Sequence, residues 1–394
     1  MAPRHLQIFV LIDALGWRCL EDRDFLSDVL PYRRPLRTIL GFSSGAIPTL
    51  LTGRLPGETG HWNLYYYDPE RSPFRWLRHF HFLPDAILDH RLTRKIVKEL
   101  GRRVLGLGPL FECAVSPRYL PWFNWTEKRN IYAPGGIAQS PSIFDALSRR
   151  GIPHRVYSYH QAGDAELLRR ARHDIASSEA TFFFLYLSEL DGFLHAHRTA
   201  EERITERLAW YDGELRALLA RARSVDSDAQ LAIMSDHGMT AVQYHVDLVS
   251  EVERLGLTMP DDYLAVYDST MARFWFFSDR ARTALPAALA GVAGGRVLME
   301  AELRELGIWF PDRRFGELIF LLDPAWLFTR SHFNDAAWSP RGMHGYHPDD
   351  ADSDAVFLSN WVPRREPRTI ADLYACMTEA AVTADIEMRE GTVR

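Results

Sequence analysis

The sequence predicts an α/β fold with a mostly parallel central sheet, helices on both of its faces and aromatic-rich cap insertions. Three apolar runs of strand length, at residues 6–12, 181–187 and 231–234, are each followed within a few residues by an aspartate. Continuous apolar runs are typical of strands that are buried on both faces of a parallel sheet. Segments of helical periodicity fill the gaps, and strands that alternate with helices indicate such a sheet.

Along the chain, the first strand is predicted over residues 6–12 and ends before Asp13 and Gly16. Helical periodicity predicts helices over residues 141–150, 164–177 and 200–223. The longest of these has glutamates early and arginines late, which matches the charge preference of a helix dipole. Toward the end of the chain, the pattern predicts a strand over residues 355–362 and a helix over residues 369–381.

Two regions interrupt this alternation, at residues 63–136 and 246–339. The first is rich in aromatic residues and the second predicts a helix near 282–290 and strands near 274–277 and 318–322. We interpret both as caps over the strand ends, so that residues 1–394 form a single catalytic domain. Any one aromatic is more often part of a core, but Trp122 and Trp125 stand beside Pro121 in a predicted loop, where they can form a substrate wall.

Composition excludes several function classes. A net charge of -6 leaves no electrostatic footprint for a nucleic-acid polymer. No run approaches the roughly 18 apolar residues that span a bilayer. Three cysteines without CxxC spacing favour a reduced compartment, and Asp13 interrupts the apolar N-terminal run before it reaches signal-peptide type, so we expect a cytoplasmic enzyme. The oligomeric state stays open.

The residues that carry chemistry are metal-ligand types at strand ends, together with a serine. They are Asp13, Asp191, His195, Asp236, His237, His344 and Ser43. Ligands gather at the carboxyl ends of the strands in such sheets, so these residues can meet although they are distant in sequence. Each has a structural explanation alone, since an aspartate after a strand can cap the next turn. Together, three Asp, three His and a Ser indicate a two-metal phosphoryl-transfer site.

The Asp-His-Gly-Met run at 236–239 and the Thr-Gly-Arg-Leu-Pro run at 52–56, in this order along the chain, resemble the alkaline phosphatase superfamily. The closest resemblance is to its type I phosphodiesterase/nucleotide pyrophosphatase branch. It covers residues 6–60 and 183–238 and the turn at His344, and it fades across both insertions. It implies an alkaline-phosphatase-like core and a metal-dependent hydrolase.

The resemblance also implies two divalent cations and a nucleophile. Asp191, His195 and His344 would hold one cation, and Asp13, Asp236 and His237 the other. Mixed Asp/His ligation favours Zn²⁺ over Mn²⁺. The superfamily nucleophile lies nine residues before the Thr of Thr-Gly, which is Ser43 here, with Ser44 as the alternative if the turn shifts by one. Asn63 matches, with a gap of one residue, the branch Asn that contacts a phosphate oxygen.

The chain departs from the branch at the nucleophile, where Ser-Ser-Gly-Ala at 43–46 replaces the usual Thr-Phe-Pro-Asn. Gly45 and Ile47 stand where a sulfatase needs Pro and Arg, so a sulfatase is disfavoured.

The expected function is cleavage of a phosphodiester or pyrophosphate bond in a small nucleotide-like or sugar-linked substrate, through a phosphoseryl intermediate. The alternatives are a phosphomonoesterase, a phosphotransferase to a sugar or lipid hydroxyl, and a binding protein without catalysis.

Overall fold

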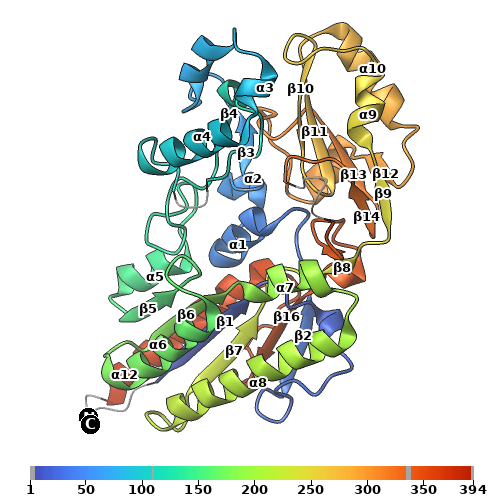
Figure 1. The fold of residues 1–394 in the computed structure, drawn as a ribbon. Coiled ribbons are helices and arrows are strands. Elements are labelled where there is room, and N and C mark those ends of the chain that lie inside the picture. Colours follow the sequence, from blue (N-terminus) through green and yellow to red (C-terminus); the bar gives the residue numbers. More distant parts are fainter. Residues whose placement is uncertain (1–4, 109–110, 334–338, 392–394) are drawn as a thin grey trace.

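The computed structural model describes residues 5–108, 111–333 and 339–391, so residues 109–110 and 334–338 of the two insertions lie outside the described part, as do both chain ends. A six-stranded sheet forms the core, in the order β2-β16-β7-β1-β6-β5 (Figure 1). The strands are β1 (Gln7–Ile12), β2 (Tyr32–Leu36), β5 (His154–Tyr157), β6 (Phe182–Leu187), β7 (Gln230–Met234) and β16 (Ala355–Ser359). β1 pairs in parallel with both β6 and β7, and β6 pairs in parallel with β5. β16 alone runs opposite to the other strands of this sheet, because it pairs antiparallel with both β2 and β7.

Helices cover both faces of this sheet, as the sequence predicts. One face packs on α6 (Asp164–Ser177), α7 (Glu189–His197) and α8 (Glu201–Arg223) through a single apolar cluster. The opposite face packs on α1 (Ser43–Thr52), α5 (Ile143–Arg150) and α12 (Leu373–Gly391). Neighbouring residues of one strand, such as Ile8 and Phe9, belong to different clusters because successive strand side chains point to opposite faces.

The first insertion folds around its own aromatic cluster. Its elements are β3 (Tyr65–Tyr67), η2 (Arg75–Phe80), α3 (Asp85–Leu88), α4 (Arg91–Arg103), η3 (Leu120–Trp122) and β4 (Phe123–Trp125). Leu264, Val266 and Trp275 of the second insertion complete that cluster, so the two insertions share a core.

The second insertion contains a four-stranded antiparallel sheet in the order β10-β11-β13-β12. Its elements are β9 (Tyr244–Val246), α9 (Leu248–Glu253), β10 (Tyr263–Tyr267), β11 (Met271–Phe276), α10 (Asp279–Leu289), β12 (Gly295–Val297), α11 (Glu300–Glu305), β13 (Leu318–Leu322) and β14 (Trp326–Phe328). Both insertions lie over the same end of the central sheet (Figure 1). The remaining elements are short: η1 (Trp17–Cys19), α2 (Pro56–Thr59), β8 (Thr240–Ala241), β15 (Gly342–Met343), η4 (Ala351–Ser353) and η5 (Ile370–Asp372).

Two expectations about local structure are corrected. Trp125 does not stand in an exposed loop: it lies in β4, is fully buried, and packs edge-on against Tyr65 and Phe111. The strand predicted over 355–362 ends at Ser359, because the chain turns where the Ser359 hydroxyl donates to the Trp361 carbonyl. Within the described ranges, no helix is both long enough and apolar enough to cross a membrane.

Candidate active site

The predicted site residues converge at the carboxyl end of the central sheet. Asp13 directly follows β1, Asp236 and His237 follow β7, and α7 begins after β6 and carries Asp191 and His195. His344 comes from much later in the chain. β15, which precedes His344, pairs antiparallel with β8, which follows His237, so the two imidazole rings stack with centroids 3.8 Å apart.

Asp191, His195 and His344 form the first group of side chains that could hold a metal ion. The Asp191 Oδ1 atom lies 3.4 Å from His195 Nε2 and 3.5 Å from His344 Nε2. His195 Nδ1 contacts the Gly342 carbonyl at 2.8 Å, which turns the other ring nitrogen toward Asp191. A backbone carbonyl on one imidazole nitrogen is the usual device that orients a metal-ligating histidine.

Asp13, Asp191 and His237 form the second group. His237 Nε2 lies 3.6 Å from Asp13 Oδ1 and 3.3 Å from Asp236 Oδ2, and His237 Nδ1 contacts the Gly238 carbonyl at 2.9 Å. The sequence assigns Asp236 rather than Asp191 to this cation. In the structure, Asp191 reaches both groups and Asp236 joins the second through His237, so the division of ligands between two ions stays a prediction.

The electrostatics of the cluster fit bound cations. One carboxylate oxygen on each of Asp13, Asp191 and Asp236 is buried without a hydrogen-bond partner among the described residues. Burial and the neighbouring carboxylates of Asp236 and Asp191 raise the pKa of Asp13 well above its usual value. Burial and the nearby His237 lower the pKa of His344 well below its usual value, which keeps its ring neutral. Three converging carboxylates with open oxygens, next to a neutral imidazole, are what divalent cations bind.

The pKa of Asp191 moves in the opposite direction. Burial alone would raise it, but the adjacent His195 and His344 outweigh burial and lower it. Asp191 is therefore a carboxylate across the ordinary pH range, which suits a residue between the two ligand groups. A further partner, Tyr186 on β6, donates its hydroxyl hydrogen to Asp13 Oδ2 and fixes that carboxylate.

The two candidate nucleophiles have different surroundings. Ser43 is the first residue of α1, and its Oγ lies 3.0 Å from His237 Nε2. The Ser44 hydroxyl is buried and donates to the Trp62 carbonyl at 2.9 Å. At Gly45, a Cβ atom would lie 2.9 Å from the Trp62 carbonyl oxygen, so only glycine lets the start of α1 approach this segment.

Two cavities flank the cluster. The larger, of about 550 Å³, is lined by Ser43 together with Glu127, Tyr132, Tyr159 and Tyr186. The smaller, of about 230 Å³, is lined by the metal-group residues His195 and His344 and by Asn63 and Asp268. Phe42, Ser44 and Leu64 line both cavities, so the two lie side by side at the start of α1.

Asn63, for which the resemblance predicts a phosphate contact, is buried in the wall of the smaller cavity, and the contact itself stays a prediction. The structure does not support the expected substrate wall at Trp122 and Trp125. Neither Trp122 nor Trp125 is among the residues that line the two cavities. Trp122 stacks on His81, 5.7 Å away, and Trp125 is in the core of the insertion. His347 contacts Glu302 at 3.4 Å, outside both metal groups.

Sequence reasoning missed several cavity residues. Tyr186 carries the one hydroxyl group of the otherwise apolar strand β6, and this break in the apolar run is a signal that could have identified it. Glu127, Tyr132 and Tyr159 come from loops and have no such signal. Asp268 is held by Arg273 from the neighbouring strand β11, with Nε at 2.9 Å, a contact that only the fold creates.

Comparisons with known proteins bear on the family and the fold of this chain. Residues 42–347 match the model of the family described as type I phosphodiesterase / nucleotide pyrophosphatase. No curated protein sequence matches the chain. Among solved structures, the fold is similar to human ectonucleotide pyrophosphatase / phosphodiesterase 5, with a TM-score of 0.68, 15% identity, and coverage of 96% of this chain and 95% of that one.

The murine protein of the same name is similar too, with a TM-score of 0.67, 16% identity and the same coverage of the two chains. A structure of its inactive variant in complex with AMP gives a TM-score of 0.66 at 16% identity, again over 96% and 95% of the two chains. The family match extends over most of the chain and includes most of the converging residues. The chain therefore belongs to the type I phosphodiesterase/nucleotide pyrophosphatase family.

Proposed function

We propose that this protein is a two-metal phosphodiesterase that cleaves a small asymmetric phosphodiester or pyrophosphate through an intermediate on Ser43. The observation that carries the proposal is the pair of cavities on the two sides of one ligand cluster. A phosphodiester has two organic arms and needs a place for each. The family match supports the same bond type.

The residues would hold the ions as two sets. Asp191, His195 and His344 suit one ion, and Asp13, Asp236 and His237 suit the other, with Asp191 close enough to assist. When bound, Zn²⁺ at both positions would lower the pKa of the nearby hydroxyl and neutralise charge that develops on the phosphate oxygens. Mn²⁺ fits the same mixture of carboxylates and imidazoles less specifically.

Ser43 would attack the phosphorus atom. As the Ser43 hydroxyl gives its proton to solvent water, the Oγ–phosphorus bond forms and the bond from phosphorus to the leaving oxygen breaks. The leaving arm gains a proton from water and departs as an alcohol from a diester, or as a phosphate from a pyrophosphate. Ser43 then carries the phosphate with the retained arm, and a water molecule cleaves that ester to give a phosphomonoester. Because attack and departure lie roughly in line, the leaving arm occupies the smaller cavity beside His195 and His344, and the retained arm occupies the larger cavity beside Ser43.

The charge around the cavities favours a diester over a monoester. A monoester dianion calls for extra arginine or lysine contacts. Among the described residues that line the smaller cavity there is no lysine or arginine. Lys128 and Arg129 line the larger cavity, but both side chains are exposed at its rim. Phosphomonoesterase activity is therefore the second candidate.

Rapid quenching of the Zn²⁺-loaded enzyme with a diester, followed by mass spectrometry, tests the intermediate. We expect the peptide that contains Ser43 to gain the mass of the phosphate with its retained arm. Added glycerol separates a hydrolase from a phosphotransferase, because only a transferase would form a glycerol ester as its main product. A Ser43→Ala enzyme that turns over normally would contradict the Ser43 intermediate.

A further inference from the structure

The outer face of the first insertion exposes apolar side chains that proteins ordinarily bury. Twelve large hydrophobic side chains are exposed among the described residues, and seven of them lie between positions 80 and 104. We call these seven the outer apolar surface: Phe80, Phe82, Ile87, Leu92, Ile96, Leu100 and Val104. So dense a concentration in one segment marks an interaction site rather than ordinary scatter.

α4 and its C-cap residue supply four of the seven side chains as a regular stripe. Leu92, Ile96, Leu100 and Val104 recur every four residues, which places them along one side of the helix. The inner side of the same helix is buried at Val97 and Gly101. The apolar stripe therefore points outward, although the helix already has a separate face that packs on the protein.

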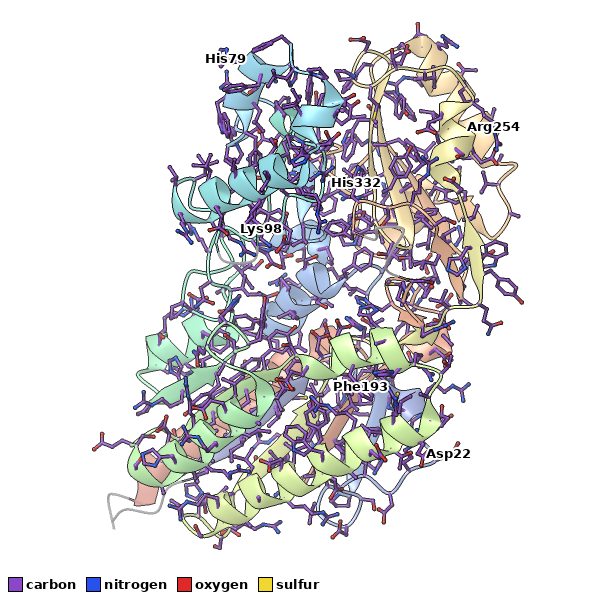
Figure 2. All side chains as sticks on the ribbon, in the orientation of Figure 1. Asp22, His79, Lys98, Phe193, Arg254 and His332 are labelled. Atoms are coloured by element: carbon purple, nitrogen blue, oxygen red, sulfur yellow. The ribbon has the colours of Figure 1, made fainter. Side chains whose placement is uncertain are left out.

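The segment beside the stripe is strongly basic. α4 contains six arginines and lysines and a single glutamate, whereas the whole chain has a net charge of -6. Four of these six are in ion pairs: Lys98 and Arg102 with Glu112, at 2.5 Å and 2.9 Å, Arg94 with Asp89 at 3.1 Å, and Arg103 with Glu99 at 2.9 Å. Arg91 and Lys95 are exposed and form no ion pair within the described residues. Figure 2 shows His79 of η2 and Lys98 of α4 in the part of the molecule that lies away from the core helix carrying Phe193.

We propose that the outer apolar surface docks on an anionic lipid surface, with the α4 stripe in the acyl region and Arg91 and Lys95 at the lipid phosphates. An amphipathic helix with a basic polar face and an exposed apolar face is the chemistry that lies in a membrane interface. The long stems of lysine and arginine let their charges reach the headgroups while the stripe inserts. Short polybasic segments are attracted to anionic lipids specifically.

A second copy of this chain suits the surface less well. A two-fold contact through α4 would place the same patch on both sides of the interface. Two helices that each carry an excess of positive charge would then face one another. A lipid surface provides apolar depth and negative charge together, and so complements both properties of α4.

The surface is connected to the larger cavity through packed residues. Gly108, which lines that cavity, lies four positions after Val104. Gly101 on the inner side of α4 leaves room for Phe111, because a Cβ atom at Gly101 would lie 2.4 Å from the Phe111 ring. The Phe111 ring packs on Trp125 at 5.1 Å, and Trp125 donates to the carbonyl of Glu127 in the cavity wall. Docking through α4 would therefore hold the cavity close to the lipid surface.

Co-sedimentation with vesicles tests the proposal on the full-length, metal-loaded protein. We expect binding to vesicles of equal parts phosphatidylglycerol and phosphatidylcholine, and at least tenfold weaker binding to pure phosphatidylcholine. Leu92→Glu/Ile96→Glu should weaken binding to the anionic vesicles at least tenfold. Arg91→Glu/Lys95→Glu should weaken it to a similar degree and remove most of its dependence on salt.

Two control variants test whether the loss of vesicle binding is specific to the outer apolar surface and to the charges of α4. Val362 is 74% exposed, and Leu92 and Ile96 are 64% and 59% exposed, so Val362→Glu places a glutamate at a comparably exposed apolar position outside the surface and should bind like the wild type. Arg149→Glu/Arg150→Glu reverses two exposed charges on α5 and should also leave binding nearly unchanged. All variants should cleave a soluble diester at the wild-type rate, which separates this proposal from the one about Ser43.

Three results would overturn the lipid proposal. One is a wild-type protein that does not sediment with the anionic vesicles. Another is a set of α4 variants that bind as well as the wild type does. The third is a concentration-dependent dimer that Leu92→Glu/Ile96→Glu converts to a monomer, since a second copy would then be the occupant of the surface.

Discussion

Ser43 and Ser44 are neighbours at the start of α1, but only one hydroxyl faces the ligand cluster. Ser43 Oγ is 3.0 Å from His237 Nε2, whereas the Ser44 hydroxyl is engaged by the Trp62 carbonyl. A nucleophile has to be free to approach phosphorus, so the geometry favours Ser43. Counting back from the Thr-Gly run predicted the same residue, with Ser44 as the alternative.

Replacement of Ser43 therefore separates chemistry from metal binding. We expect Ser43→Ala to lower kcat by at least about a thousandfold, because no other group replaces the nucleophile. The metal content, measured by atomic absorption, should stay at the wild-type value. Ser44→Ala is the matched control: it should cost about 1 kcal/mol of folding free energy through its lost hydrogen bond and keep most of the turnover. The opposite ranking of the two variants would assign the nucleophile to Ser44.

Glu127 provides a second prediction for a single residue, through pH. Burial raises the pKa of Glu127 from 4.5 to about 7. The folded protein thus holds a proton that the unfolded chain releases, and stability decreases as pH rises from about 4.5 to about 7. Glu127→Gln removes this loss, so we expect the variant to exceed the wild type at pH 8 by on the order of 1–2 kcal/mol after solvent screening is allowed for.

Urea unfolding of both proteins at pH 5 and pH 8 measures this difference. The difference in unfolding free energy between Glu127→Gln and the wild type should be small at pH 5 and large at pH 8. The exposed Glu70 offers the control, since Glu70→Gln should follow the wild type at both values. A gap for Glu127→Gln that is the same at both pH values would show that the Glu127 carboxyl does not titrate as described.

At the scale of elements, a buried ion pair fixes the β10–β11 turn against the first insertion. Arg273 on β11 is fully buried, and its Nε donates to Asp268 at 2.9 Å while Nη1 donates to the Tyr65 carbonyl at 2.8 Å. Asp268 in turn lines the smaller cavity. The pair thereby links β3, β10 and β11 to the wall of the site.

Arg273→Met should leave the Asp268 charge buried without its partner. We expect a loss of about 3–5 kcal/mol in unfolding free energy. Arg282→Met provides a comparison, because the Arg282–Glu317 pair has the same 2.9 Å separation but a 56% exposed arginine. That variant should lose less than about 1 kcal/mol. If urea unfolding gave the same loss of free energy for Arg273→Met and Arg282→Met, the buried pair would stabilise the fold no more than the exposed pair does.

The elements also show where sequence prediction works. The helix over 164–177 and the strand over 318–322 match α6 and β13 at both ends, because long helical periodicity and dense apolar runs are strong signals. β2 and β5 were missed. β2 contains two arginines and a proline, which only an edge strand tolerates, and β5 is short and half-exposed at the other edge.

For the molecule as a whole, the convergence of the candidate ligands could be predicted from the sequence, but the cavities could not. Asp13, Asp191 and Asp236 follow buried strands, and parallel strands deliver their ends to one place. The cavity walls depend on insertions without a regular pattern, so Glu127 and Asp268 become neighbours of the site only through tertiary packing. For the same reason, the expected substrate wall at Trp125 became part of a core.

Metal removal tests how the cluster contributes to the stability of the molecule. Because three carboxylates converge and one oxygen of each has no hydrogen-bond partner in the part of the chain that the structure describes, bound cations should stabilise the fold. We expect EDTA to lower Tm by several °C, and added Zn²⁺ to restore it. Asp191→Asn changes the one carboxylate that belongs to both groups, and it should remove most of the EDTA effect. A wild-type Tm that stays the same when EDTA is added would contradict cation binding at this cluster.

The most direct test of the central claim is parallel turnover of bis(p-nitrophenyl) phosphate and p-nitrophenyl phosphate by the Zn²⁺-loaded protein, with and without EDTA. The two cavities and the family match predict faster cleavage of the diester, loss of that activity in EDTA, and its recovery on addition of Zn²⁺. Faster cleavage of the monoester would contradict the phosphodiesterase proposal and identify a phosphatase. Diester cleavage that persists in EDTA would contradict the metal-dependent mechanism.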